Sequence, residues 1–246
     1  MGFVMLCAAG VGLATVAGSV LSLFIKEVPR KLNGVILSLA AGIMLGATFF
    51  SLIWPALMHA EDSVWPCILG LAAGAALIKL MERFVPSIHK LLYAGRDKSP
   101  QLDRVLLFLI AIAIHNLPEG MAVGVSFGSG DTTNALSIAI GIALQNIPEG
   151  MITILPLLMA GTSRKRALLV ALFTGLTEIV GTFVGYIAVT LASAILPFAL
   201  ALAGGTMLYV ICHDMIPETH SQGCEDIATY SLIGGVVIMM LIQHFL

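Results

Sequence analysis

The stretch His115-Asn116-Leu117-Pro118-Glu119-Gly120 recurs thirty residues later, almost unchanged, as Gln145-Asn146-Ile147-Pro148-Glu149-Gly150. Both copies lie inside long apolar segments, and each contains a candidate ligand, an amide, a helix-bending proline and a carboxylate. A carboxylate among apolar residues of this kind is costly and usually marks a functional site. The two hexapeptides therefore indicate a polar site that is built from two similar halves inside an apolar protein.

The composition indicates an integral membrane protein. Of the 246 residues, 59% are hydrophobic and 11% are charged, with a mean hydropathy of +1.02. Soluble domains carry about 25% charged residues. A net charge of −2 gives no reason to expect a nucleic-acid partner. We therefore expect one all-α transmembrane domain over residues 1–246, in contact with the lipid bilayer.

The apolar segments number eight if each spans the membrane as a helix of about 20 residues. Six of them are expected at about residues 3–25, 32–58, 63–80, 105–127, 133–160 and 227–246. The remaining stretch, residues 167–217, has no basic residue and is too long for one helix, so we divide it near residues 193–197. The longest polar connection covers residues 82–104.

The basic residues indicate the orientation of the chain. All 12 lie in the odd-numbered connections, within Lys26–Lys31, Lys79–Arg104 and Arg164–Arg166. Basic residues favour the cytoplasmic side of a membrane. We therefore expect both termini outside, a cytoplasmic loop over about residues 82–104, and a multi-pass protein of the cell (inner or plasma) membrane.

Three polar side chains of each hexapeptide share one helix face. At about 100° per residue, His115, Asn116 and Glu119 lie within about a quarter to a third of the helix circumference. The second copy repeats this arrangement with Gln145, Asn146 and Glu149. The prolines cannot donate to the carbonyl groups four residues earlier, so each helix bends and opens space beside these side chains.

Residues from four segments are expected at one depth. Glu119 and Glu149 are each fifteen residues from a basic edge, roughly 22 Å along a helix. Glu178 and Met44 lie at roughly 18 and 20 Å by the same rule. Clustered carboxylates in an apolar medium must hold protons or share a cation. Carboxylates with a histidine, amides and a thioether suit a divalent metal such as Zn²⁺, whereas polar residues that only join helices by hydrogen bonds are the simpler alternative.

On these motifs the chain resembles the ZIP (Zrt/Irt-like) metal transporters, most closely the bacterial eight-helix GufA-like branch. The resemblance covers the whole chain and implies a ZIP-type bundle with inverted repeats and a metal site near the membrane centre, often a binuclear one. One metal ion would then be held by Met44, His115, Glu119, Gln145 and Glu149. The second ion would be held by Asn116, Glu119, Asn146, Glu149 and Glu178. Many relatives have His in place of Gln145, so we expect an asymmetric site here.

Polar residues on either side of this level are candidates for the transport pathway. Ser51 lies on the outer side of Met44 and is predicted to line the entrance. A cluster near the cytoplasmic side is predicted to line a release path, with an ordinary polar helix end as the alternative. This cluster comprises His213, Asp214, Glu218 and His220.

The resemblance implies a secondary transporter that moves Zn²⁺ into the cytoplasm by alternating access, with Cd²⁺, Fe²⁺ or Mn²⁺ as further substrates. In the family the first, fourth, fifth and sixth helices move against a scaffold of the other four. A passive metal channel would use similar ligands bound more weakly, and it stays an alternative. A membrane di-metal enzyme would commonly carry Glu-x-x-His pairs, which this sequence lacks. We therefore expect no enzyme, and the oligomeric state, including a homodimer, is left open.

Overall fold

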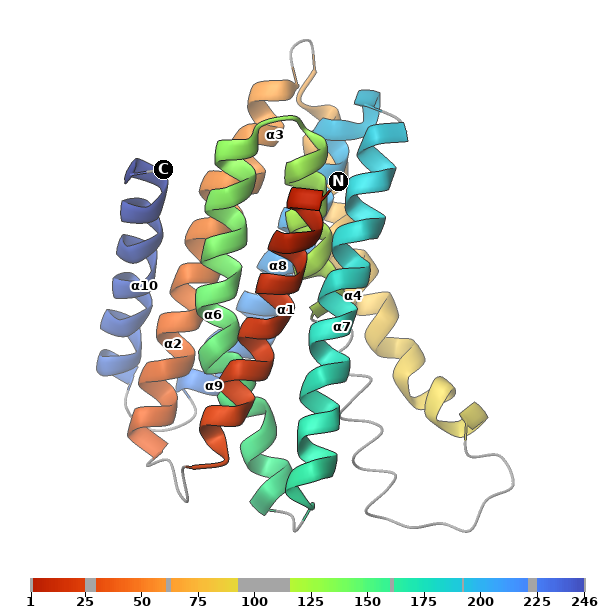
Figure 1. The fold of residues 1–246 in the computed structure, drawn as a ribbon. Coiled ribbons are helices and arrows are strands. Elements are labelled where there is room, and N and C mark those ends of the chain that lie inside the picture. The colour runs from red at the N-terminus through yellow and green to blue at the C-terminus, as the bar shows by residue number, and fades with distance from the viewer. Residues whose placement is uncertain are drawn as a thin grey trace.

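The computed structural model describes residues 2–24, 30–60, 63–92, 116–159, 162–191, 193–220 and 225–245, which are almost entirely helical. Their helices stand side by side in one bundle, and both ends of the chain lie toward the same end of it (Figure 1). The first elements are α1 (Gly2–Ser22), α2 (Arg30–Ala47), the π-helical turn η1 (Thr48–Ile53), α3 (Trp54–His59) and α4 (Trp65–Leu92). Residues 116–128 form the next described helix. The later elements are α6 (Thr132–Met159), α7 (Arg164–Leu191), the 3-10 turn η2 (Ser193–Ile195), α8 (Leu196–Val210), the π-helical turn η3 (Ile211–Met215), α9 (Ile216–His220) and α10 (Glu225–Phe245).

These bounds agree with most predicted segments to within a few residues. The predicted division of the long stretch 167–217 is confirmed, because η2 separates α7 from α8. The third segment is the clearest difference, since α4 was expected to end near Leu80 and continues to Leu92. Its extension contains Leu, Met, Glu, Arg and Lys, which favour helix even where polarity predicts a loop. Residues 105–115 of the fourth segment, with His115, lie outside the described residues.

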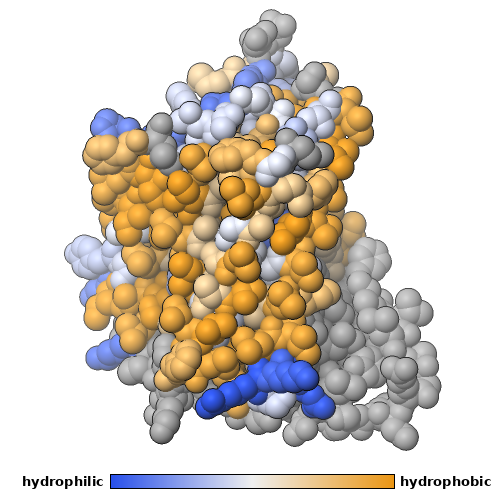
Figure 2. Space-filling model, in the orientation of Figure 1, coloured by the Kyte–Doolittle hydropathy of each residue, from blue (hydrophilic) through white to orange (hydrophobic). Residues whose placement is uncertain are grey.

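Length and hydropathy agree with a membrane protein. Among the described residues five helices are long and apolar enough to cross a membrane. They are Gly2–Ser22, Gly34–His59, Arg164–Leu191, Leu196–His220 and Glu225–Phe245. Figure 2 shows that the visible face of the bundle is largely apolar, with a strongly hydrophilic patch at its lower end, where the exposed Arg164–Arg166 begin α7. The count of eight spans and the outside position of both termini stay predictions.

The described helices form two groups. In one group α1 packs along both α6 and α7, and in the other α2 packs along α10 and α4 along α8. The two groups meet most extensively where α2 lies against α6. Helix 116–128 belongs to the first group, because its glycines approach α7 closely.

A short sequence repeat lies where α1 and α7 of the first group touch. Gly12–Ser19 of α1 reads GLATVAGS, and Gly175–Thr182 of α7 reads GLTEIVGT. Gly12 and Gly175 touch, since a Cβ atom on either glycine would lie 2.5 Å from the carbonyl oxygen of the other. The two helices run in opposite directions (Figure 1), so the octapeptides are inverted copies of one another.

The second glycine of each octapeptide contacts one of the hexapeptides. A Cβ atom on Gly18 would lie 1.9 Å from the carbonyl oxygen of Ile147, and one on Gly181 would lie 2.3 Å from that of Leu117. Ile147 and Leu117 occupy the same third position of the two hexapeptides. Small residues at these points let the helix backbones approach closely.

Candidate metal centre

The final glycine of each hexapeptide brings a further helix against the carboxylate-bearing turn. A Cβ atom on Gly120 would lie 2.0 Å from the carbonyl oxygen of Glu178 in α7. One on Gly150 would lie 2.2 Å from the carbonyl oxygen of Thr15 in α1. Any side chain at these positions would push the helices apart. The motif therefore positions four helices around its two glutamates: α1, helix 116–128, α6 and α7.

Glu178 is the hub of a buried hydrogen-bond network. Its side chain is 0% exposed, and its Oε1 atom accepts hydrogen bonds from Thr15 Oγ1, at 2.7 Å, and from Asn116 Nδ2. Its Oε2 atom accepts from Asn146 Nδ2 at 2.7 Å. Asn146 Nδ2 also lies 3.3 Å from the carbonyl oxygen of Val11. One carboxylate thus joins α1, both hexapeptides and α7.

Gln145 extends this network to the second carboxylate. Its Nε2 atom donates to Glu119 Oε1 at 2.6 Å and to Asn146 Oδ1 at 3.3 Å. Glu119 and Gln145 are both buried. The structure therefore brings together Asn116, Glu119, Gln145, Asn146 and Glu178, five of the predicted ligands, at one level of the bundle.

The network contains more acceptors than donors. Three of its buried oxygen atoms have no hydrogen-bond partner among the described residues: Asn116 Oδ1, Glu119 Oε2 and Gln145 Oε1. A buried polar atom without a partner costs about 1–3 kcal/mol, and more when it is charged. A cation is the natural partner for a surplus of buried oxygen acceptors, because it satisfies several of them at once.

The three neighbouring glutamates also favour a bound cation. Glu149 and Glu178 are both close enough to Glu119 to act on it electrostatically, and Glu149 also acts on Glu178. Glu149 is partly exposed, whereas the other two carboxylates are buried. Three neighbouring carboxylates repel one another in a medium of low polarity, and a shared divalent cation removes that repulsion.

Met44 lies in α2 and is 2% exposed. A Cβ atom on Gly141 of α6 would lie 3.6 Å from the Cβ atom of Ala47, which marks where α2 and α6 touch. The two helices run in opposite directions (Figure 1), so one turn from that contact leads to Met44 on α2 and to Gln145 on α6. Met44 therefore lies at the level of the network, in agreement with the depth predicted from the sequence.

The carboxylates alone do not form a conventional metal site. Within the described ranges no group of three or more His, Cys, Asp or Glu side chains is arranged to hold a metal ion. His115 is outside those ranges, so its predicted role stays a prediction. The ligands that this part of the chain offers are carboxylate oxygens supplemented by the amide oxygens of Asn116 and Gln145.

Comparison with known proteins identifies the family. Residues 93–243 match the family model described as ZIP Zinc transporter. The chain belongs to this family. It is 39% identical to Zinc transporter GufA of Myxococcus xanthus, over 94% of each chain. It is 36% identical to Zinc transporter ZIPB of Bordetella bronchiseptica, over 99% of this chain and 81% of that protein, and 34% identical to Zinc transporter ZupT of Chlorobium phaeovibrioides, over 94% and 92%.

Family membership confirms several predictions from the sequence. ZIP proteins are multi-pass membrane transporters rather than enzymes, and the five apolar helices of membrane length agree with a location in the cell membrane. The resemblance to the GufA-like branch is also confirmed.

Ser51 of this ZIP protein lies in a polar cluster away from the metal centre, here called the outer cluster. The hydroxyl groups of Ser51 and Ser137 donate to Gln243 Oε1, at 3.0 and 2.8 Å. Asn134 Nδ2 donates to the carbonyl oxygen of Ser51 at 3.0 Å. Pro55, four residues later, has no N–H to offer that oxygen. The outer cluster thus joins η1 and α10 to α6, across the junction of the two helix groups.

The cluster predicted for the release path lies in η3 and α9, in the lower half of the bundle in Figure 1. His213 is exposed, and its ring centroid lies 4.9 Å from that of Tyr209. His220 Nδ1 lies 2.9 Å from a carbonyl oxygen of the preceding turn. Asp214 is partly exposed and Glu218 is exposed. This polar helix end lies toward the same end of the bundle as Arg164–Arg166.

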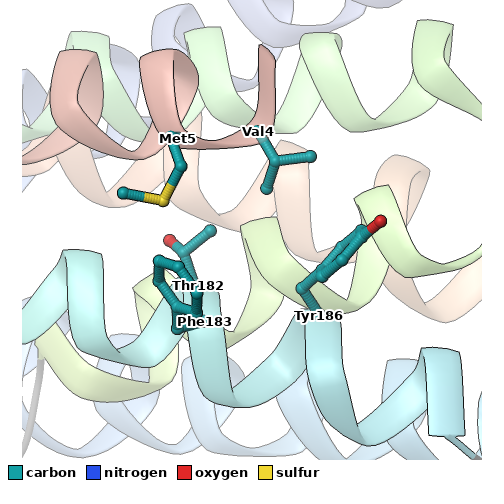
Figure 3. Close-up of a pocket in the computed structure, with 5 residues that line it drawn as sticks. All are labelled: Val4, Met5, Thr182, Phe183 and Tyr186. Carbon is teal, nitrogen blue, oxygen red and sulfur yellow. The ribbon is translucent and has the colours of Figure 1, made fainter. Parts of the chain in front are cut away.

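A crevice between α1 and α7 is the pocket drawn in Figure 3. It has no room for a water molecule and is lined by Val4, Met5, Thr182, Phe183 and Tyr186. The hydroxyl of Thr182 donates to the carbonyl oxygen of Glu178 at 2.9 Å, within its own helix. The lining is otherwise largely apolar, so this crevice belongs to the packing of α1 on α7 and offers little to a cation.

Thr15 is the residue of the centre that the sequence interpretation missed. A threonine in an apolar helix gives no signal by itself. The signal that would have identified it is the octapeptide repeat, in which Thr15 occupies the position of Glu178.

Proposed function

We propose that this ZIP protein carries Zn²⁺ across the membrane into the cytoplasm through the centre formed by the two hexapeptides. The observation that carries the proposal is the set of three buried oxygen atoms, on Asn116, Glu119 and Gln145, that have no partner within the described ranges and lie next to three interacting carboxylates. That three relatives are named zinc transporters favours Zn²⁺ as the cargo. Cd²⁺, Fe²⁺ and Mn²⁺ accept similar ligands and are proposed as further substrates.

The centre is proposed to hold one or two ions. The first ion takes the softer ligands, the thioether of Met44 and the imidazole of His115, together with Glu119, Gln145 and Glu149. The second takes the oxygen ligands of Asn116, Glu119, Asn146, Glu149 and Glu178. Support for this division is that each proposed set includes buried oxygens without a hydrogen-bond partner among the described residues. These are Glu119 Oε2 and Gln145 Oε1 in the first set, and Asn116 Oδ1 and Glu119 Oε2 in the second.

The proposed mechanism is alternating access rather than an open channel. Burial of Glu119, Gln145 and Glu178 supports it, because a continuous pore would leave ligands exposed to water. The helix group that includes α1, α6 and α7 carries every proposed ligand except Met44. It would move along the contact of α2 with α6. A Cβ atom on Gly141 there would lie 2.8 Å from the Sδ atom of the flexible Met239 side chain, and its nearest neighbours include no backbone atom.

Metal ions are proposed to enter past Ser51 and to leave past the polar helix end formed by η3 and α9. This direction assumes eight spans with the basic connections in the cytoplasm and both termini outside. Under that orientation Arg164–Arg166 and the release residues share the cytoplasmic end. The release residues are His213, Asp214, Glu218 and His220.

Zinc uptake by purified protein in proteoliposomes tests the proposal. Wild-type uptake should saturate with Zn²⁺ concentration, and Glu149→Ala and His115→Ala should each reduce it by more than about tenfold, since even partners outside the ligand shell affect metal sites by 10–100-fold. Ser231→Ala, an exposed hydroxyl that bonds within α10, is the control and should transport normally. Wild-type rates in both site variants would refute the assignment, and uptake that never saturates would favour a channel.

A further inference from the structure

We infer that Thr15 of α1 is a positioning residue of the metal centre. Its hydroxyl holds Glu178 so that Asn116 and Asn146 turn their amide nitrogens toward that carboxylate, which leaves the Asn116 oxygen for the cation. The inference rests on the proposed function, because it concerns the same metal centre. No residue of α1 is among the ligands carried over from the family resemblance.

The contact between Gly12 and Gly175 explains why Thr15 and Glu178 meet. The helices α1 and α7 run in opposite directions (Figure 1), so residues three positions after the touching glycines lie on opposite sides of the crossing. Helical side chains tilt toward the N-terminus of their own helix. Thr15 and Glu178 therefore lean toward one another over two residues without side chains, and their oxygen atoms come within 2.7 Å.

The repeat explains why Thr15 has this role. Thr15 is the fourth residue of the octapeptide in α1, and Glu178 is the fourth residue of the inverted copy in α7. Their backbone surroundings match, because Gly150 packs on the carbonyl of Thr15 as Gly120 packs on that of Glu178. A second carboxylate at this position would face Glu178 directly and add repulsion. The threonine instead supplies a donor to its counterpart.

The hydroxyl of Thr15 affects the amides through Glu178. An ionised carboxylate only accepts hydrogen bonds, so Asn116 and Asn146 must both offer it their NH₂ groups. This orientation is what leaves Asn116 Oδ1 without a donor among the described residues. With Thr15 in place, Oε1 of Glu178 has two donors and is held in one position. Without it, the Glu178 carboxylate is free to rotate, and the orientation that it imposes on the Asn116 amide is lost.

Zn²⁺ titration of the purified full-length protein in detergent tests this inference. Thr15→Ala and Thr15→Val should weaken binding about tenfold, as expected for a partner outside the ligand shell. Thr15→Ser keeps the hydroxyl and should bind within about twofold of wild type. Thr206→Val, a buried threonine of α8 that bonds within its own helix, is the matched control for loss of a hydroxyl and should bind normally.

A cycle with Glu178→Gln separates positioning from a general structural effect. If Thr15 acts through Glu178, Thr15→Ala should cause little further loss of Zn²⁺ affinity in the Glu178→Gln background, because coupled residues are not additive. An undiminished tenfold loss in that background, or Ala and Ser variants that bind alike, would overturn the inference. The thermal unfolding temperature of each variant is measured as well, so that a loss of binding caused by misfolding is recognised.

Glu119→Gln distinguishes this inference from the proposed function. If Glu119→Gln leaves Zn²⁺ affinity unchanged, the hexapeptide centre is not the metal site and the proposed function fails. If Glu119→Gln abolishes binding while every Thr15 variant binds as wild type, only the role of Thr15 is wrong.

Discussion

The two halves of the first helix group share their backbone contacts but not their side-chain chemistry. In one half the glycines of α1 and α6 bring Thr15 and Gln145 to the centre, and in the other the glycines of α7 and helix 116–128 bring Glu178 and the segment that follows His115. Within the octapeptides and hexapeptides the glycine positions correspond one to one. The polar positions differ: His115 corresponds to Gln145, and Glu178 corresponds to Thr15.

This difference separates what the repeat must keep from what it is free to change. Close helix crossings tolerate no side chain at the touching points, so the glycines of the octapeptides and hexapeptides recur in both halves. The space at the centre accepts several polar residues, and there the halves have diverged. In our proposal, one half carries the stronger metal ligands, and the other supplies donors that orient them.

Breaking the shared backbone contact should have the largest effect. Gly120→Ala and Gly150→Ala place a Cβ atom 2.0 and 2.2 Å from a facing carbonyl oxygen, so the helices must separate. We expect each to lower the free energy of unfolding by at least about 1–3 kcal/mol, and to lower zinc uptake in both cases. Gly10→Ala in α1, which has nothing within 4 Å, is the control and should melt at or above the wild-type temperature. Wild-type stability of both hexapeptide variants would show that the crossings are looser than described.

The next prediction compares the equivalent first positions of the hexapeptides. His115→Ala should lower Zn²⁺ affinity by at least about tenfold, because imidazole is a strong zinc ligand. Gln145→Ala should lower Zn²⁺ affinity by a smaller factor, since an amide oxygen is a weaker ligand. Both are measured by Zn²⁺ titration in detergent. Equal losses would contradict the asymmetry proposed for the centre.

Making the halves more alike should have a smaller effect, in the opposite direction. Gln145→His replaces an amide with an imidazole and should tighten Zn²⁺ binding by up to about tenfold. The gain should be smaller for Mn²⁺, which prefers oxygen ligands. A titration without any gain for Zn²⁺ would place residue 145 outside the ligand shell.

The outer cluster should give the smallest effect on metal binding. Gln243 accepts from two buried hydroxyls, so Gln243→Leu removes the acceptor and should cost about 1–3 kcal/mol of stability. The outer cluster lies away from the metal centre and, within the described ranges, has no buried oxygen acceptor left open for a cation. We therefore expect the Zn²⁺ affinity of Gln243→Leu to stay within about twofold of wild type. Gln243→Glu retains an oxygen acceptor and is the control for stability. A large loss of affinity in Gln243→Leu would show that the outer cluster and the metal centre are coupled.

The sequence by itself determined much of this protein. Apolar segments of membrane length predicted an all-helical membrane fold, and the division of residues 167–217 was placed correctly. Similar spacing from the basic residues predicted that side chains of several helices lie at one level, because helical rise converts residue number into depth. Polarity misplaced the end of α4, since charged residues such as Arg83 are also good helix formers.

Only the tertiary structure decided which side chains meet at that level. Helical periodicity states which residues share a face of one helix, but not which residue of another helix lies opposite. That pairing depends on where the backbones cross, and the crossings are set by pairs of glycines far apart in the sequence, such as Gly12 and Gly175. The crossing brings the hydroxyl of Thr15 to Glu178, in a centre where three buried oxygen atoms have no donors in the part of the chain that the structure describes.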